Sequence, residues 1–351
     1  MTDQKTYPPI SDYALIGDCR TAALISKSGS VEWLCLPDFD SPSLFCSILD
    51  REKGGHLRVA PKQPVSTSRR YVEGTNVLET THLTETGTLR VTDFLPVIDG
   101  ETSVLQPERE LLRIIEAVEG SVDVEIEFVP RPNYGRAPAR IEKRGRLGWT
   151  VTEPAAPYLL RSDIELSSAD GRSVSGGARI AQGERRYVSL SYTGRDTAVI
   201  PCIGKESDDK LDYSIRWWRA WSTQCSYEGP FKDAVLRSAL ALKALQFALS
   251  GAVIAAATSS LPEAIGAERN WDYRYCWLRD ASFTLLAFTD TGFFSEGAAF
   301  FNWLMHITRM THPTLQPLYS IYGLTRLQEA ELAHLEGYQG SRPVRIGNGA
   351  Y

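Results

Sequence analysis

The sequence contains few of the residues from which metal, redox and nucleophile sites are commonly built. Its 351 residues include only five histidines and six cysteines, and no two cysteines have the C-x-x-C spacing of a zinc or redox centre. His306 and His312 lie close together in the sequence but without an HExxH frame, so we expect no metal site there. Gly-rich phosphate loops and Gly-x-Ser-x-Gly elbows are absent, and no Ser–His–Asp set can be argued.

Long hydrophobic runs and a strong charge of one sign are also absent. The longest apolar run, residues 251–257, is far shorter than the roughly 20 residues of a membrane helix. The polar start at residues 1–5 carries no apolar signal-peptide core, which predicts a reduced, cytoplasmic location. A net charge of −5 gives no electrostatic reason to bind nucleic acid or an anionic membrane. We therefore expect neither as a partner, and the residues call for no cofactor.

The first two hundred residues have the pattern of short antiparallel strands. Residues 122–128 alternate apolar and acidic side chains, which is typical of a half-buried strand. Turn residues separate further short apolar runs, so we predict two hairpins and two more strands. These lie at residues 21–25 with 31–36, at 83–94, at 187–192 and at 197–200. Many short strands with turns between them predict an antiparallel β-sandwich.

The period changes from strand-like to helix-like near Asp208. Leu211, Ile215, Trp218 and Trp221 form one apolar stripe of a predicted helix. A second stripe is predicted from Phe231, Val235, Leu242, Leu245 and Leu249. Two further helices are expected at residues 279–289 and 295–310, with Gly292 as a C-cap between them and a loop-rich tail from 313 to 351. We predict a sandwich at 1–205, a helical linker at 206–230 and a helical region at 231–351.

Four helices make a poor domain alone, because half a helical layer leaves apolar faces without a partner. Two interpretations follow: either the helices pack on the sandwich, or the chain is part of something longer.

The segment with the densest chemistry is residues 269–280, directly before a predicted helix. It holds three Arg, two Asp, two Trp and two Tyr in twelve residues. Aromatic rings stack on the C–H faces of sugars, and Arg and Asp hydrogen-bond sugar hydroxyls. Asp280 is also a candidate helix cap. The alternative is a structural ion pair, Arg279 with Asp272 or Asp280, inside an aromatic core, and the residues alone leave both open.

The basic residues between 131 and 146 lack regular aromatics, so we interpret them as a solvated hairpin face.

Several motifs in order resemble a known family. Residues 270–280, NWDYRYCWLRD, resemble the start of the catalytic barrel of glycoside hydrolase family 15. Residues 10–21, ISDYALIGDCRT, and 29–43, GSVEWLCLPDFDSPS, are similar to the trehalase-like N-terminal domain of its bacterial and archaeal branch. Residues 131–135, RPNYG, and 334–348, HLEGYQGSRPVRIGN, are similar as well. The resemblance covers essentially the whole chain.

The resemblance implies a β-super-sandwich followed by the first helices of an (α/α)6 barrel. It also implies inverting hydrolysis of α-glucosides, which requires two carboxyl groups about 6.5–9.5 Å apart, one as acid and one as base. In the family both are glutamates that follow the segment matched here, so we expect them beyond Tyr351. No catalytic residue is assigned within this chain. Glu336 lies in a matched motif but not in the catalytic one, so it is not predicted to be catalytic.

The resemblance also suggests which residues bind the sugar. Arg279 and Asp280 match the pair that binds the innermost glucose, and Trp271, Asp272 and Trp277 belong to the same motif. The expected partner is a small carbohydrate, trehalose or a short α-glucan such as a maltooligosaccharide, and a homo-oligomer is compatible with the sequence. The alternatives are a truncated, inactive carbohydrate-binding fragment and a structural sandwich domain without a sugar site.

Overall fold

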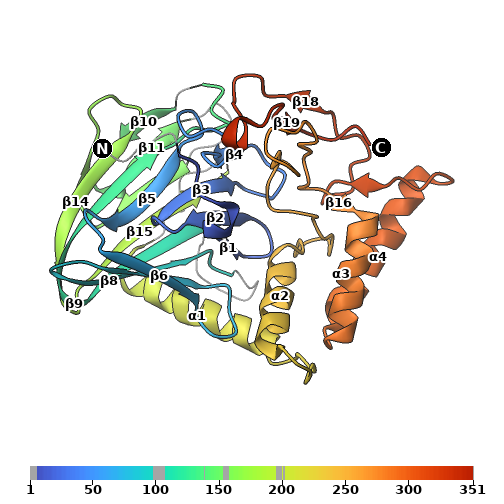
Figure 1. Ribbon diagram of the computed structural model, residues 1–351, viewed down its shortest axis with the longest axis horizontal. Helices are drawn as coiled ribbons and strands as arrows, with labels where there is room; N and C mark the ends of the chain where they lie inside the picture. Colours follow the sequence, from blue (N-terminus) through green and yellow to red (C-terminus); the bar gives the residue numbers. More distant parts are fainter. Residues whose placement is uncertain are drawn as a thin grey trace.

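A computed structural model describes residues 6–97, 107–137, 139–152, 158–194, 200 and 202–350. Within these residues an N-terminal antiparallel β-region is followed by four helices and a loop-rich tail (Figure 1). This confirms the predicted order of the two regions. The predicted start at residues 1–5 lies outside the described part.

The secondary structure has the following bounds. The strands are β1 (Tyr13–Gly17), β2 (Ala22–Ser26), β3 (Ser30–Cys35), β4 (Ser43–Phe45), β5 (His56–Pro61), β6 (Ser66–Tyr71), β7 (Leu78–Leu83), β8 (Gly87–Phe94), β9 (Arg109–Val129), β10 (Arg140–Lys143), β11 (Trp149–Thr152), β12 (Tyr158–Ser162), β13 (Leu166–Ser167), β14 (Val174–Ala181), β15 (Arg185–Tyr192), β16 (Cys276–Trp277), β17 (Leu318–Tyr319), β18 (Ala330–Glu331) and β19 (Arg345–Ile346). The helices are α1 (Lys205–Ser222), α2 (Lys232–Ala244), α3 (Leu278–Asp290) and α4 (Phe294–Thr311), with short 3₁₀ turns at Ile10–Asp12, Gly145–Leu147 and Tyr338–Gly340.

The strand β9 joins the two layers of the β-region. Its first half pairs with β8 and β15, and its second half pairs with β5 and β14. Gly120, between the halves, has φ +64°, and a Cβ there would come within 2.2 Å of the Thr86 carbonyl oxygen. Only glycine adopts this conformation without strain at so close an approach. One strand thus turns from one layer into the other.

The core lies between the apolar faces of these layers. Val122, Val124, Ile126 and Phe128 are buried as the alternation predicted, while the acids between them point outward. They pack with buried residues of the neighbouring strands in a single cluster. Full burial of one such side chain contributes about 1.5–3 kcal/mol, so this cluster is the main source of stability of the β-region.

The first half of β9 was not predicted, because it is buried on both faces and shows no alternation. Leu112 and Ile114 on its outer face pack against Leu211 and Ile215 of α1. The interpretation that the helices pack on the sandwich is therefore correct for α1. The predicted apolar stripe of α1 is also confirmed. Figure 1 shows α1 running along the sandwich and α3 beside α4 further away.

Two predicted elements need correction. In α2 the fully buried residues are Ala239, Leu240 and Ala244; the predicted stripe is wrong at its two ends, although Leu242 and Leu245 do pack against buried clusters. Phe231 and Leu249 lie outside α2 and are exposed. The strand expected at 197–200 falls mostly outside the described residues, and Ile200 belongs to no strand.

The last two helices were predicted correctly within two residues at each end. Gly292 follows α3 with φ +93°, and its N–H donates to the Thr289 carbonyl, as expected of a residue after a helix C-terminus. No described helix has the length and apolarity that a membrane crossing requires. The division of the chain at residues 205 and 230 stays a prediction.

Candidate functional site

The segment from Trp271 to Trp277 is extended, because it pairs with the chain that runs from residue 255 to 260. The N–H groups of Ala256 and Ser260 donate to the carbonyls of Tyr273 and Trp271, both at 2.9 Å. The segment then forms β16, which pairs with β17, and α3 starts at Leu278. In an extended chain successive side chains point to opposite faces, so the segment has two chemically different faces.

One face of this segment is turned into the protein and the other is half exposed. Asp272, Arg274 and Cys276 have 0%, 1% and 0% exposure. Of the residues that alternate with them, Trp271, Tyr273 and Trp277 are partly exposed, whereas Tyr275 is buried, at 7% exposure. The alternation therefore separates the buried charges from an outward row of aromatic rings.

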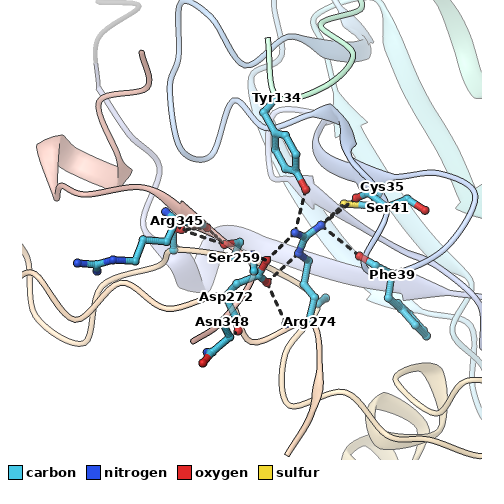
Figure 2. Close-up of polar contacts among 12 residues, drawn as sticks. Cys35, Phe39, Ser41, Tyr134, Ser259, Asp272, Arg274, Arg345 and Asn348 are labelled. Atoms are coloured by element: carbon cyan, nitrogen blue, oxygen red, sulfur yellow. Dashed lines mark hydrogen bonds and ion pairs between the residues drawn. The ribbon is translucent and has the colours of Figure 1, made fainter. Parts of the chain in front are cut away.

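The buried charges form a bidentate ion pair (Figure 2). The Arg274 Nη2 and Nε atoms lie 2.6 and 2.9 Å from the two carboxylate oxygens of Asp272. Asp272 also accepts hydrogen bonds from the backbone N–H groups of Arg274 and Gly347, at 3.2 and 3.1 Å. Although burial opposes the charged guanidinium, the Asp272 carboxylate raises the pKa of Arg274 well above its ordinary value. Both oxygens of Asp272 are therefore occupied by protein donors.

The other side of the Arg274 guanidinium contacts the N-terminal region. Arg274 donates to the Ser41 carbonyl at 2.9 Å and to the Tyr134 hydroxyl at 2.8 Å. Its Nη1 also lies 3.5 Å from the Cys35 sulfur, whose pKa burial raises to about 11. Figure 2 shows the guanidinium surrounded by these groups. We call Asp272, Arg274, Tyr134 and Ser41 the Arg274 hub.

A second ion pair lies in the first turn of α3 and faces solvent. Arg279 Nη2 is 3.0 Å from Asp280 Oδ2, and the two side chains are 71% and 38% exposed. The Arg279 guanidinium lies 5.9 Å from the centroid of the Trp277 ring, which is 6.1 Å from that of Tyr273. The predicted helix cap is wrong: Trp277 is the N-cap residue of α3, and no side chain caps it.

The structure brings three of the five predicted sugar-binding residues together. Trp277, Arg279 and Asp280 are adjacent. Tyr273 is a fourth member of this group; it lies in the same motif but is not among the five predicted sugar-binding residues. Burial raises the pKa of Tyr273, and the carboxylates of Glu263 and Asp280 add to the shift. Period-two alternation of aromatic residues could have identified Tyr273.

The other two predicted residues lie elsewhere. The Trp271 ring is covered by the Arg345 guanidinium at 4.6 Å, and Asp272 belongs to the Arg274 hub. In the described part of the chain, no hydrogen bond, ion pair or ring contact links Trp271 or Asp272 to Trp277, Arg279 or Asp280. The sequence analysis left open a structural ion pair between Arg279 and Asp272 or Asp280. A buried ion pair of Asp272 is present, but its cation is Arg274 rather than Arg279.

The remaining candidates have ordinary structural surroundings. His306 and His312 are exposed, and the described residues contain no group of three metal-ligating side chains. In the basic stretch Arg140 and Arg144 pair with Glu142 on the surface.

Comparisons with known proteins match both parts of the chain. Residues 3–188 match the family described as "Trehalase-like, N-terminal", and residues 229–351 match "Glycosyl hydrolases family 15". Trehalases of Mycolicibacterium smegmatis and Mycobacterium tuberculosis are each 38% identical, over 100% and 98% of this chain and 55% and 54% of their own lengths. A trehalase of Thermoplasma volcanium is 36% identical over 98% of this chain and 54% of its own length.

The two family matches, over consecutive parts of the chain, relate it to the glycosidase class of hydrolases. The chain belongs to glycosyl hydrolase family 15, in the branch with a trehalase-like N-terminal domain. It spans about half the length of the curated relatives it matches.

Proposed function

We propose that the chain supplies the sugar-binding part of an inverting glycoside hydrolase whose substrate is trehalose or a short α-glucan, such as a maltooligosaccharide. The observation that carries this proposal is the exposed Arg279–Asp280 pair, at 3.0 Å, beside the partly exposed Trp277 ring. The relatives named trehalases support the α-glucosidic substrate.

The chemistry of this group suits a glucose ring. A carboxylate such as Asp280 accepts hydrogen bonds from two hydroxyls, and the Arg279 fork donates to neighbouring oxygens. The Trp277 ring offers an apolar face against which the C–H side of a pyranose can stack. Because Arg279 and Asp280 have no partner beyond each other and the Trp277 ring among the described residues, their remaining donors and acceptors are free for a ligand.

The five predicted residues take different roles in this proposal. Trp277, Arg279 and Asp280 contact the sugar, whereas Trp271, whose ring is covered by the Arg345 guanidinium at 4.6 Å, is assigned no contact with it. Asp272 has no free oxygen and no exposure, so we assign it support of the segment through Arg274 rather than contact with the sugar.

The proposal assigns neither the general acid nor the general base to a residue of this chain, so the 351-residue chain should bind sugar without hydrolysing it. Each such group contributes typically about 10²–10⁴-fold to the rate. An assay of glucose release from trehalose and maltose should therefore detect none. Release at an ordinary enzymatic rate would contradict this assignment.

Calorimetric titration tests the binding site itself. We expect trehalose or maltose to bind, and cellobiose, a β-linked disaccharide of the same composition, to bind far more weakly. Asp280→Asn should weaken binding of the α-linked sugar by at least about tenfold, because a polar group of the site is then left unpaired. If neither α-linked sugar binds, the chain is a structural domain without a sugar site and the proposal fails.

A further inference from the structure

The Arg274 guanidinium connects segments that are far apart in the sequence. On one side it holds Asp272, which in turn accepts the backbone N–H of Gly347. On the other side it reaches the carbonyl of Ser41 and the hydroxyl of Tyr134, both in the N-terminal region. Because it is 1% exposed and uses all three of its nitrogens, it has little freedom to move.

The backbone that presents Tyr134 to Arg274 is itself unusual. Asn133 and Tyr134 have φ values of +52° and +61°, in the left-handed region that bulky residues rarely adopt. The conformation is held by a hydrogen bond from the Tyr134 N–H to the Ser43 carbonyl at 3.2 Å and by the contact of His334 with the Tyr134 carbonyl at 2.8 Å. Such strain persists only where the surrounding structure fixes it, and it concentrates at functional sites.

Arg274 lies only three residues before Trp277, in the same extended segment. The intervening chain is paired on both sides: Ala255 donates to the Tyr275 carbonyl at 3.0 Å, and Cys276 pairs with Tyr319 in β17. No loop separates Arg274 from Trp277, so a displacement of Arg274 also displaces Trp277 and the start of α3.

We propose that Arg274 is a positioning residue, which anchors the sugar-binding group of Trp277, Arg279 and Asp280 to the N-terminal β-region. This inference rests on the proposed function for the identity of the sugar site. It assigns to the β-region a part in sugar binding that it performs without touching the sugar.

A purely structural role for Arg274 would affect stability alone, and the chain contains a matched control for that role. Arg113 and Asp93 form another bidentate pair, at 2.7 and 3.1 Å, with both side chains fully buried. Like Arg274, Arg113 also donates to carbonyl oxygens, those of Leu57 and Gly29 at 2.8 and 2.9 Å. It lies within the β-region and touches none of the sugar-binding residues in the described structure.

The experiment compares Arg274→Lys with Arg113→Lys in the full 351-residue chain. Tyr134→Phe is a milder third variant, which keeps the ring and the ion pair and removes only one hydroxyl. The first readout is the NMR signal of the Trp277 indole N–H, assigned by its loss in Trp277→Phe. That Nε1 atom has no partner among the described residues, so its signal responds to small displacements. The second readout is the Kd for trehalose at a temperature where each variant is folded.

We expect Arg274→Lys to move the Trp277 signal and to weaken trehalose binding about tenfold, the scale on which groups that support a site act. Tyr134→Phe should do both to a lesser degree, and Arg113→Lys should do neither. Unchanged trehalose affinity in folded Arg274→Lys and Tyr134→Phe, or an equal loss in Arg113→Lys, would overturn the inference. If the wild-type chain binds no trehalose, the proposed function fails, and the Trp277 signal alone then decides whether Arg274 positions the segment.

Discussion

Two Arg–Asp pairs lie within nine residues of each other, and their surroundings are opposite. The Asp272–Arg274 pair has an N–O distance of 2.6 Å and is at most 1% exposed, whereas the Arg279–Asp280 pair is longer, at 3.0 Å, and faces solvent. The first has every carboxylate oxygen occupied, while the second has no hydrogen-bond partner but itself in the described structure. Residue type alone therefore does not distinguish a fully occupied, buried pair from a pair whose side chains keep unused donors and acceptors.

The energetics of the two pairs differ for the same reason. A buried charge that loses its partner keeps its full desolvation penalty, so breaking such a pair costs typically about 3–5 kcal/mol. An exposed pair is screened by water and contributes about 0–1 kcal/mol. The buried pair should therefore control folding, and the exposed pair is free to serve a ligand.

The largest effect is expected when the buried pair is broken. Arg274→Met leaves the Asp272 carboxylate buried without its cation, and we expect the free energy of unfolding to fall by about 3–5 kcal/mol. Urea denaturation measures this. The control is Arg179→Met, which breaks an exposed pair with Asp123 at 3.6 Å and should change stability by less than about 1 kcal/mol. Equal losses in the two variants would show that the Arg274 hub is not a structural centre.

Substitution of Asp40, which is next to the Arg274 hub, is expected to change stability by an intermediate amount that depends on pH. Burial raises the pKa of Asp40 to about 6, although the Arg274 charge opposes the shift. Because the pKa is higher in the folded state than the ordinary value of 3.8, the stability that Asp40 contributes is complete below pH 3.8 and is lost as the pH rises through 6.

Asp40→Asn should therefore stabilise the chain at pH 8, by up to about 3 kcal/mol at about 1.4 kcal/mol per pKa unit. The gain should shrink to about half at pH 5. Thermal unfolding at the two pH values measures it. A gain that does not depend on pH, or a loss at pH 8, would contradict the burial of an ionisable Asp40 beside Arg274.

The smallest effect on stability is expected at the exposed pair. Arg279→Lys keeps the charge but replaces the planar fork by a single ammonium group. The free energy of unfolding should change by less than about 1 kcal/mol, while trehalose binding should weaken by about tenfold. Chemical denaturation and titration of the same preparation give both numbers. A loss of stability without a loss of affinity would assign Arg279 a structural role.

Local pattern made much of the fold predictable. The hairpin between β2 and β3, the alternating half of β9 and the stripe of α1 each follow from residues close together in the sequence. The first half of β9 could not be found in this way, because α1 covers its outer face and both faces are buried. The two ends of the stripe of α2 were misplaced, since the residues that face its neighbours depend on tertiary packing.

The candidate site could be located from the sequence but not divided into its parts. The motif predicted five sugar-binding residues, and the structure places three of them, Trp277, Arg279 and Asp280, next to one another, while their role in sugar binding stays a prediction. That Asp272 is buried depends on Arg274, which is fixed by Tyr134 and Ser41, more than 130 residues away. No local pattern carries that information, although the alternation of aromatic and charged residues separates the two faces.

The central claim is that two aspartates of one motif have separate roles, and the same substitution at each tests it most directly. Asp272→Asn and Asp280→Asn should be compared by urea denaturation and trehalose titration on the same samples. We predict that Asp272→Asn loses about 3–5 kcal/mol of stability. Asp280→Asn should lose less than about 1 kcal/mol but at least about tenfold in affinity. If Asp280→Asn unfolds as readily as Asp272→Asn and binds trehalose normally while folded, the account is contradicted.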